Sequence, residues 1–259
     1  MSFSFEAKNE LCRLPVQKLC CARAEAYGVL LYCNTFSARE IRVMTESEAF
    51  AKRLPPLLKK AFRITFDRLP DGEGKYIFSI MDRDKLAAVH QTFGSDLGAL
   101  ALHLNFAVLE ESCCRTSFLR GAFLAGGSVT DPRKGYHLEL ATTHQSVSRE
   151  LEALMREMEL EPKAAQRKGN SVIYFKQSDR IEDFLTSIGA PVSAMEVMNA
   201  KLEKDIRGSV NRRVNCDAAN LDKAVEAAMV QLEAIRRLEE RGRLALLPDK
   251  LKETAALRL

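Results

Sequence analysis

The sequence of 259 residues lacks the features of exported, membrane-spanning and disordered chains. The nearest candidate for a membrane span, Phe118–Val129, contains Arg120 and is much shorter than the ~20 apolar residues that a bilayer requires. The N-terminal sequence MSFSFEAKNE has no basic segment followed by an apolar one, so we expect no export signal. Proline and glycine are scarce (8 and 13 residues) and charges of both signs are mixed, which excludes a disordered chain. We therefore expect a cytosolic globular protein with no membrane partner.

The spacings typical of zinc sites are missing as well. The sequence has seven cysteines, and two pairs are adjacent in the chain, Cys20-Cys21 and Cys113-Cys114, but no two form a C-x-x-C spacing. None of the four histidines lies at a ligand spacing from another candidate ligand. We expect most of the cysteines to be reduced and to pack as small hydrophobic residues, with no metal and no cofactor.

The charge of the chain is nearly balanced. Residues 200–259 hold 13 Lys and Arg against 10 Asp and Glu, and residues 1–199 hold the remaining 26 against 25, for a net charge of +4. A protein that binds nucleic acid mainly through electrostatics is usually more basic. Charge alone therefore does not decide the function, whereas 46% hydrophobic residues are enough for a substantial core.

The first two hundred residues contain an internal repeat. Cys20-Cys21 and Gly28 recur as Cys113-Cys114 and Gly121, at an offset of 93 residues. Further along, Phe78 and Asp82-Arg83 recur at an offset of 97, as a loop insertion of four residues would produce. Self-similarity at a fixed offset indicates that one structural unit occurs twice.

Both copies have the same predicted order of elements, α-β-β-α-β-β-α. Each begins with an apolar helix rich in small residues, over residues 20–33 and 113–127. The clearer strands cover residues 40–44, 62–68 and 76–80 in the first copy, and residues 136–142, 163–167 and 172–176 in the second. We predict an α+β fold with two pseudo-symmetric halves, residues 1–108 and 109–200, followed by a helical segment over residues 201–259.

Small residues on the two opening helices indicate where the halves meet. Glycine inside a helix costs up to about 1 kcal/mol relative to alanine, so several on one helix suggest a packing role. A flexible helix end would explain Gly126-Gly127 equally well, but it does not explain Gly121. The residues predicted to bring the helices together are Gly28, Gly121, Ala125, Gly126 and Gly127.

The two opening helices also carry a recognisable signature. Residues 119–127 (LRGAFLAGG) and 26–34 (AYGVLLYCN) resemble the nine-residue motif of the LAGLIDADG homing endonucleases. The resemblance implies a fold that lies on DNA and holds divalent cations through an acidic residue at the eighth motif position of each half. Gly126 and Cys33 occupy that position here, and Leu124 and Leu31 occupy the sixth, which is also acidic in the signature. Magnesium requires carboxylate oxygens, so we expect no catalytic residues and no nuclease activity.

Three segments resemble the bacterial WhiA sporulation-regulator family: residues 1–11, 113–140 and 209–235. The resemblance implies a degenerate LAGLIDADG body joined to a C-terminal helix-turn-helix. It also implies transcriptional control during sporulation, and a link to cell division and chromosome segregation in bacteria that do not sporulate. In the family a further stretch follows the position of KLKETAALRL, so we expect an incomplete helix-turn-helix and weak binding to duplex DNA.

Basic and amide side chains are the candidates for DNA contact, because such groups bind phosphates and base edges. We expect residues 211–215 between two helices, with Asp217 or Asn220 as a helix cap. The alternative for the body residues is that they are solvated at exposed sheet edges. The alternative for Arg236–Arg243 is that these cations stabilise the C-terminal end of a helix without contacting DNA. The predicted DNA-contacting residues are Asn211, Arg212, Arg213, Asn215, Asn220 and Lys223 in the C-terminal segment and Arg63, Lys163, Arg167, Lys168 and Lys176 in the body.

Three functions compete on these grounds. The favoured one is a non-enzymatic, nucleoid-associated transcriptional regulator that binds duplex DNA and works with other transcription or division proteins. The second is a protein-interaction module derived from the LAGLIDADG fold without DNA binding of its own, which the neutral body favours. The third, a metal-dependent nuclease, is disfavoured by Gly126 and Cys33.

Overall fold

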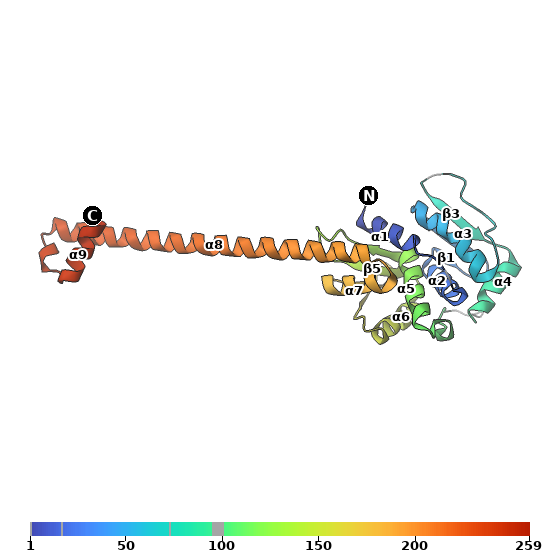
Figure 1. Cartoon of the computed structure of the whole chain (residues 1–259). Helices are drawn as coiled ribbons and strands as arrows, with labels where there is room; N and C mark the ends of the chain where they lie inside the picture. The colour runs from blue at the N-terminus through green and yellow to red at the C-terminus, as the bar shows by residue number, and fades with distance from the viewer. Residues whose placement is uncertain (1, 17, 73, 95–100) are drawn as a thin grey trace. The chain divides into compact units, whose positions relative to one another are not determined.

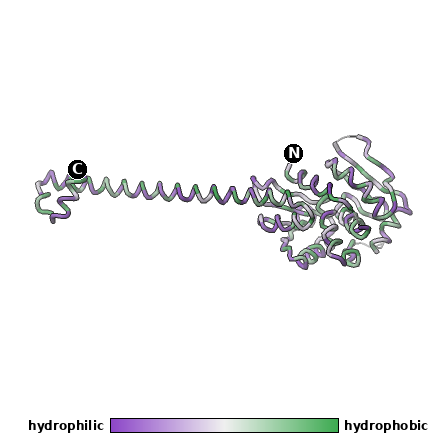
Figure 2. The backbone as a smooth tube through the Cα atoms, viewed as in Figure 1, coloured by the Kyte–Doolittle hydropathy of each residue, from purple (hydrophilic) through white to green (hydrophobic). Residues whose placement is uncertain are grey.

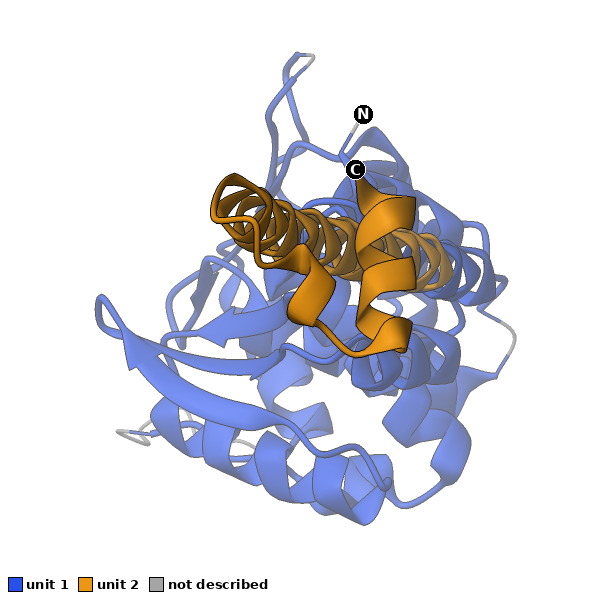
Figure 3. Ribbon diagram, turned by 90° about the vertical axis from the view of Figure 1, so that its left-hand side faces the viewer, with its two compact units in different colours: residues 1–201 blue, residues 202–259 orange. Residues whose placement is uncertain are grey.

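The computed structural model describes residues 2–16, 18–72, 74–94 and 101–259. The chain divides into two units, residues 1–201 and residues 202–259, drawn in blue and orange in Figure 3. Both predicted halves fall within the first unit. Of the helices that the structure describes, none combines the length and the apolar character of a membrane span.

After an additional N-terminal helix, the first unit contains the predicted order of elements in full in the second copy and with one strand fewer in the first (Figure 1). The first copy consists of α1 (Phe3–Cys12), α2 (Leu19–Tyr32), β1 (Thr35–Phe36), β2 (Ile41–Thr45), α3 (Glu48–Phe62), β3 (Tyr76–Ile80) and α4 (Arg83–Thr92). The second consists of the 3-10 helix η1 (Phe106–Leu109), α5 (Ser112–Gly126), β4 (Gly127–Val129), β5 (Leu138–Thr142), α6 (Gln145–Glu157), β6 (Lys163–Arg167), β7 (Asn170–Phe175) and α7 (Ser178–Ile188). The α+β prediction is confirmed.

The strands form two antiparallel sheets, ordered β1-β2-β3 and β4-β5-β7-β6. The prediction of a strand over residues 62–68 is wrong, since only the bridge between Arg68 and Ser79 forms there. Arg63 caps α3 in the left-handed conformation, with φ of 61°. This cap turns the chain away from the helix axis, so residue 63 cannot continue into an extended strand.

The helices α2 and α5 cross at the centre of the unit, and the two motif glycines allow their close approach. A Cβ atom on Gly28 would lie 2.1 Å from the carbonyl oxygen of Phe118, and one on Gly121 would lie 2.0 Å from that of Glu25. The two contacts are equivalent, since both partners are related by the offset of 93 residues. The predicted packing through Gly28 and Gly121 is therefore present, and it makes the repeat a structural pseudo-two-fold.

Gly126, at the end of α5, lies against Tyr32 of α2 and so takes part in the predicted helix contact, and Gly126 and Gly127 also shape the turn into β4. Gly126 ends the helix, and a Cβ there would meet the carbonyl oxygen of Ala141 at 2.7 Å and the Tyr32 ring at 2.9 Å. Gly127 begins β4, where a Cβ would lie within 2.6 Å of atoms of Phe123. These glycines allow a helix to turn directly into a strand, so the prediction of a flexible helix end is not needed.

The C-terminal segment consists of α8 (Pro191–Glu240), η2 (Leu244–Leu246) and α9 (Asp249–Arg258). The prediction of a break at residues 211–215 is wrong, because α8 runs through them. Residues 209–241 contain neither glycine nor proline, and asparagine lowers helix propensity without interrupting the backbone hydrogen bonds. Asp217 and Asn220 are therefore interior helix residues and cap nothing. Figure 2 shows hydrophilic and hydrophobic residues alternating along α8.

Candidate nucleic-acid interface

The motif positions that would hold a catalytic cation carry side chains that cannot do so. The Sγ atom of Cys33 lies 3.1 Å from the carbonyl oxygens of both Leu30 and Thr35. Burial raises the pKa of the Cys33 thiol to about 12, so it stays protonated and donates to these carbonyls. A protonated thiol is not a ligand for a hard cation.

The second half offers no ligand either. Gly126 has no side chain, and Tyr32 and Ala141 fill the space that a carboxylate would need. Leu31 and Leu124, at the other acidic position of the signature, are buried with 1% of their surface exposed. The residues at these positions do not fit the divalent cations that the fold family would bring.

A buried charge network lies between the motif helices instead. Glu25 on α2, which is 1% exposed, receives two hydrogen bonds from the Arg53 guanidinium, at 2.5 Å and 2.8 Å. Arg120 on α5 lies 3.5 Å from the same carboxylate and donates from Nε to the carbonyl oxygen of Ile188 at 2.8 Å. Because Arg53 also binds the carbonyls of Cys12 and Leu14, and Arg120 that of Ile188, the network ties the ends of α1 and α7 to α2, α3 and α5.

The four-stranded sheet has one face covered by α5 and α6 and one outer face exposed to solvent. The strand register places Lys163 of β6 opposite Tyr174 of β7, and Arg167, four residues further along β6, lies on the same outer face. Lys176, which follows β7, has the same parity as Tyr174 and also lies on this face. Three of the predicted body residues therefore share one surface.

Tyr174 is the centre of that surface. The Arg167 guanidinium and the Lys176 ammonium lie 5.8 Å and 5.5 Å from the centroid of its ring. Glu139 on the neighbouring strand β5 contacts Arg167 at 3.3 Å and His137 at 2.9 Å. An aromatic ring flanked by cations is a surface on which phosphates and nucleotide bases can bind, and Glu139 offsets part of its positive charge.

The other two predicted body residues lie elsewhere. Arg63 is the exposed cap of α3 and not a strand residue, so it lies outside both sheets. Lys168 is exposed in the turn between β6 and β7, where its φ is 49°. Neither residue shares the outer face with Tyr174.

Two basic residues on the three-stranded sheet were not among the predicted DNA contacts. Arg42 of β2 pairs with Ser79 of β3 and is exposed, whereas its neighbours Ile41 and Val43 are buried. Arg68 bridges to the same Ser79 from the other side and is also exposed. The alternation of buried and exposed residues in the strand 40–44 was the signal that could have identified Arg42.

The predicted DNA-contacting residues of the C-terminal segment are all exposed on α8. Asn211 and Asn215, four residues apart, share one face of the helix, and Arg212 and Lys223, about three turns apart, share another. Of residues 202–259, all of which the structure describes, only Ala255 is buried. Nothing within this unit therefore covers these side chains.

Two family models match the chain from residue 115 onward. The model described as the WhiA LAGLIDADG-like domain matches residues 115–207, and the one described as the WhiA C-terminal HTH domain matches residues 210–259. A probable cell division protein WhiA of Ruminiclostridium cellulolyticum is 36% identical over 270 residues, which cover 100% of this chain and 86% of that protein. The chain belongs to the WhiA family. The WhiA protein of Bacillus cytotoxicus, named in the same way, is 36% identical over 272 residues, covering 100% of this chain and 85% of its own.

Comparison with solved structures shows the same fold. The crystal structure of full-length DUF199/WhiA from Thermatoga maritima superposes with a TM-score of 0.70 at 24% identity, covering 100% of this chain and 87% of that one. A structure of an I-DmoI variant in complex with its target DNA superposes with a TM-score of 0.50 at 12% identity, covering 68% of this chain and 98% of that one. The body of this WhiA family member thus has a LAGLIDADG-like fold.

Proposed function

We propose that the chain is a non-enzymatic, DNA-binding transcriptional regulator of the WhiA type. The observation that supports this most strongly is the match of residues 210–259 to the family's helix-turn-helix model, on a stretch where Arg212, Arg213 and the neighbouring amides are exposed. Arginine binds phosphates and amide side chains reach backbone or base edges, so this surface has the chemistry of a DNA contact. The outer face around Tyr174 is the second proposed contact.

The same proposal excludes cleavage of the bound DNA. Hydrolysis of a phosphodiester by this fold requires a metal ion between nucleophile and leaving group, and Gly126 and Cys33 supply no ligand for one. The names of the relatives favour a role in cell division. A role in sporulation and chromosome segregation, an association with the nucleoid and contacts with other transcription or division proteins complete the proposal.

The test is a fluorescence-anisotropy titration of a labelled duplex with the full chain at about 50 mM and about 200 mM salt, since phosphate contacts make binding salt-dependent. We expect binding at low salt that weakens as salt rises. The double variant R212A/R213A should bind more weakly at both concentrations, with a salt slope shallower by about 1.8, because each phosphate contact contributes about 0.9. Arg156→Ala is the matched control, since Arg156 is exposed on α6 and pairs with Glu152. Absence of binding at low salt would contradict the proposal.

A protein-interaction module without DNA binding is the second candidate function. It is favoured by large apolar side chains that are exposed along α8, among them Ile206, Leu221 and Met229, each 65% exposed. Several large apolar side chains exposed on one helix are typical of a surface that binds another protein. Under this alternative the R212A/R213A variant would not change binding to any duplex, because the wild-type chain would bind none.

A further inference from the structure

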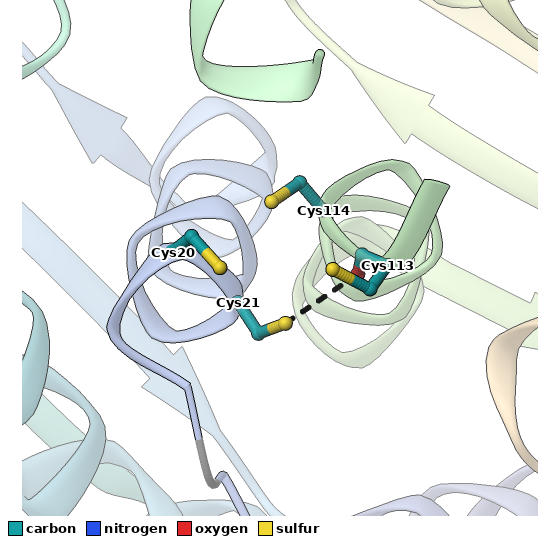
Figure 4. A group of neighbouring side chains, drawn as sticks. All are labelled: Cys20, Cys21, Cys113 and Cys114. Carbon is teal, nitrogen blue, oxygen red and sulfur yellow. Dashed lines mark hydrogen bonds between the residues drawn. The ribbon is translucent and has the colours of Figure 1, made fainter. Parts of the chain in front are cut away.

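Four of the seven cysteines lie together at one end of the motif helices, although the sequence places the two pairs far apart. The Sγ atoms of Cys20, Cys21, Cys113 and Cys114 all lie within 4.8 Å of one another. Figure 4 shows Cys20 and Cys21 on α2 and Cys113 and Cys114 on α5, with the four sulfur atoms directed into the space between the two helices. No disulfide links them, since all seven cysteines are free thiols.

The pseudo-two-fold of the fold produces this arrangement. Cys20 and Cys21 are the second and third residues of α2, and Cys113 and Cys114 are the second and third residues of α5. The glycine contacts described above bring the two helix backbones together, so equivalent residues at their N-terminal ends face one another. One pair of cysteines from each half thus forms a set of four thiols, which no C-x-x-C spacing in the sequence predicts.

Four thiols at this separation match the ligand set of one tetrahedral ion. Zinc binds four thiolates at about 2.3 Å, which separates the sulfur atoms by about 3.8 Å. Sulfur atoms already within 4.8 Å of one another need only small rotations about their side-chain bonds to reach that geometry. One ion is also the most that this space suits, since a multi-iron cluster needs its thiolates further apart.

The electrostatic setting suits an anionic metal centre. The N-terminus of a helix carries a partial positive charge. Here two helix N-termini meet at the same point, and a zinc ion with four thiolates has a net charge of −2 that both ends stabilise. The neighbouring Ser117 donates to the carbonyl oxygen of Cys113 at 2.8 Å, which orders the first turn of α5 around this ligand.

The cluster is closed on one side and accessible on the other. Cys114 is buried, Cys21 and Cys113 are half-buried, and Cys20 is exposed. A surface pocket lined by Lys18, Cys21 and Cys113 provides a path by which an ion can enter.

We propose that Cys20, Cys21, Cys113 and Cys114 form a tetrathiolate zinc site that links the two LAGLIDADG-like halves at the N-terminal ends of α2 and α5. Binding displaces the thiol protons to solvent and involves no redox step. The ion has a structural role, because four protein ligands leave no open position for a substrate. The site is independent of DNA binding, so the proposal does not rest on the proposed function.

The test measures zinc and iron bound to the full chain, purified without chelator, by elemental mass spectrometry. We expect about one zinc per chain in the wild type, as for a four-coordinate structural site, and less than about a tenth of that in C21S/C113S. Cys216→Ser is the matched control, since Cys216 is an exposed cysteine on α8, and it should keep its zinc. A wild-type chain without zinc, a chain loaded with iron, or a double variant that retains zinc would overturn the proposal.

A second measurement covers the case in which the double variant does not fold. Cobalt added to the chelator-treated wild-type chain should produce sulfur-to-cobalt charge-transfer bands and the visible bands of a tetrahedral site, and zinc should then remove them. Native mass spectrometry of the untreated chain should show the mass of one zinc ion. A chain lighter by four hydrogen atoms and free of metal would mean two disulfides, and it would overturn the zinc site.

Discussion

The contact between α2 and α5 leads to a prediction about Gly121, which lies against the other helix backbone. In Gly121→Ala the new Cβ would lie 2.0 Å from the carbonyl oxygen of Glu25 and 2.9 Å from its carbon. Cβ atoms essentially never approach another heavy atom within 3.0 Å, so the two helices must separate by about 1 Å. The atom in the way belongs to a helix backbone and cannot move aside by rotating a side chain.

The cost of this separation follows from the packing around it. A gap of about 0.5–1 Å removes a quarter to a half of the dispersion energy of each contact across the interface. Overpacking of this kind costs about 1–3 kcal/mol and occasionally more, and replacing a helical glycine by alanine returns about 1 kcal/mol. Because the obstacle is backbone, we expect the upper end of the range and a net loss of about 2 kcal/mol in the free energy of unfolding.

Thermal and denaturant unfolding monitored by circular dichroism measure this loss. For a unit of about 200 residues, a loss of about 2 kcal/mol lowers the melting temperature by about 4–8 °C. Gly208→Ala is the matched control, because a Cβ there meets only the Arg212 side chain at 3.7 Å. This control should stabilise α8 locally by up to about 1 kcal/mol through helix propensity.

The double variant Gly28→Ala/Gly121→Ala sharpens the test. Both substitutions separate the same two helices. The free energy of unfolding lost in the double variant should therefore be smaller than the sum of the losses in the two single variants. A Gly121→Ala chain as stable as the wild type, or stabilised as much as Gly208→Ala, would refute the close approach of the motif helices.

Three further predictions concern charged side chains. Glu25→Ala should cost about 3–5 kcal/mol in denaturant unfolding, because Arg53 and Arg120 keep buried charges without their common partner; a loss below about 1 kcal/mol would contradict the network. The Lys85 ammonium, together with two backbone amides, holds the pKa of the Asp67 carboxyl at about 2 instead of 3.8. Asp67→Asn should therefore be less stable than the wild type above pH 3.8, and in melts at a series of pH values this difference should vanish as the pH falls to about 2. Arg167→Ala should weaken duplex binding and make its salt slope shallower by about 0.9, whereas an unchanged slope would remove the Tyr174 face from the interface.

Much of the fold could be predicted from local patterns and from the repeat. The offset of 93 residues predicted the pairing of α2 with α5, because equivalent glycines in two copies indicate a symmetric contact. The strand 62–68 could not be excluded in the same way, since the left-handed cap at Arg63 is imposed by the end of α3 and not by a glycine. The predicted break at residues 211–215 failed because asparagines permit a turn without requiring one.

The candidate site was less predictable than the fold. The motif positions of Cys33 and Gly126 followed directly from the sequence, and so did the absence of a cation ligand there. The outer face around Tyr174 depends on strand register, which fixes the side of the sheet on which Lys163 and Arg167 lie. The four thiols could not be predicted from spacing rules, because those rules describe ligands close in the chain and not pairs related by symmetry.

The most direct test of the proposed function, DNA binding without cleavage, follows one labelled duplex, incubated with the full chain and Mg²⁺ at low salt. Native gel electrophoresis reports the bound fraction, and a denaturing gel of the same sample reports the length of the strand. We predict a retarded duplex whose strand keeps its full length. A strand that is cut only when Mg²⁺ is present would contradict the claim that the motif helices supply no ligand for a catalytic cation. A duplex that is never retarded would contradict the proposed DNA binding.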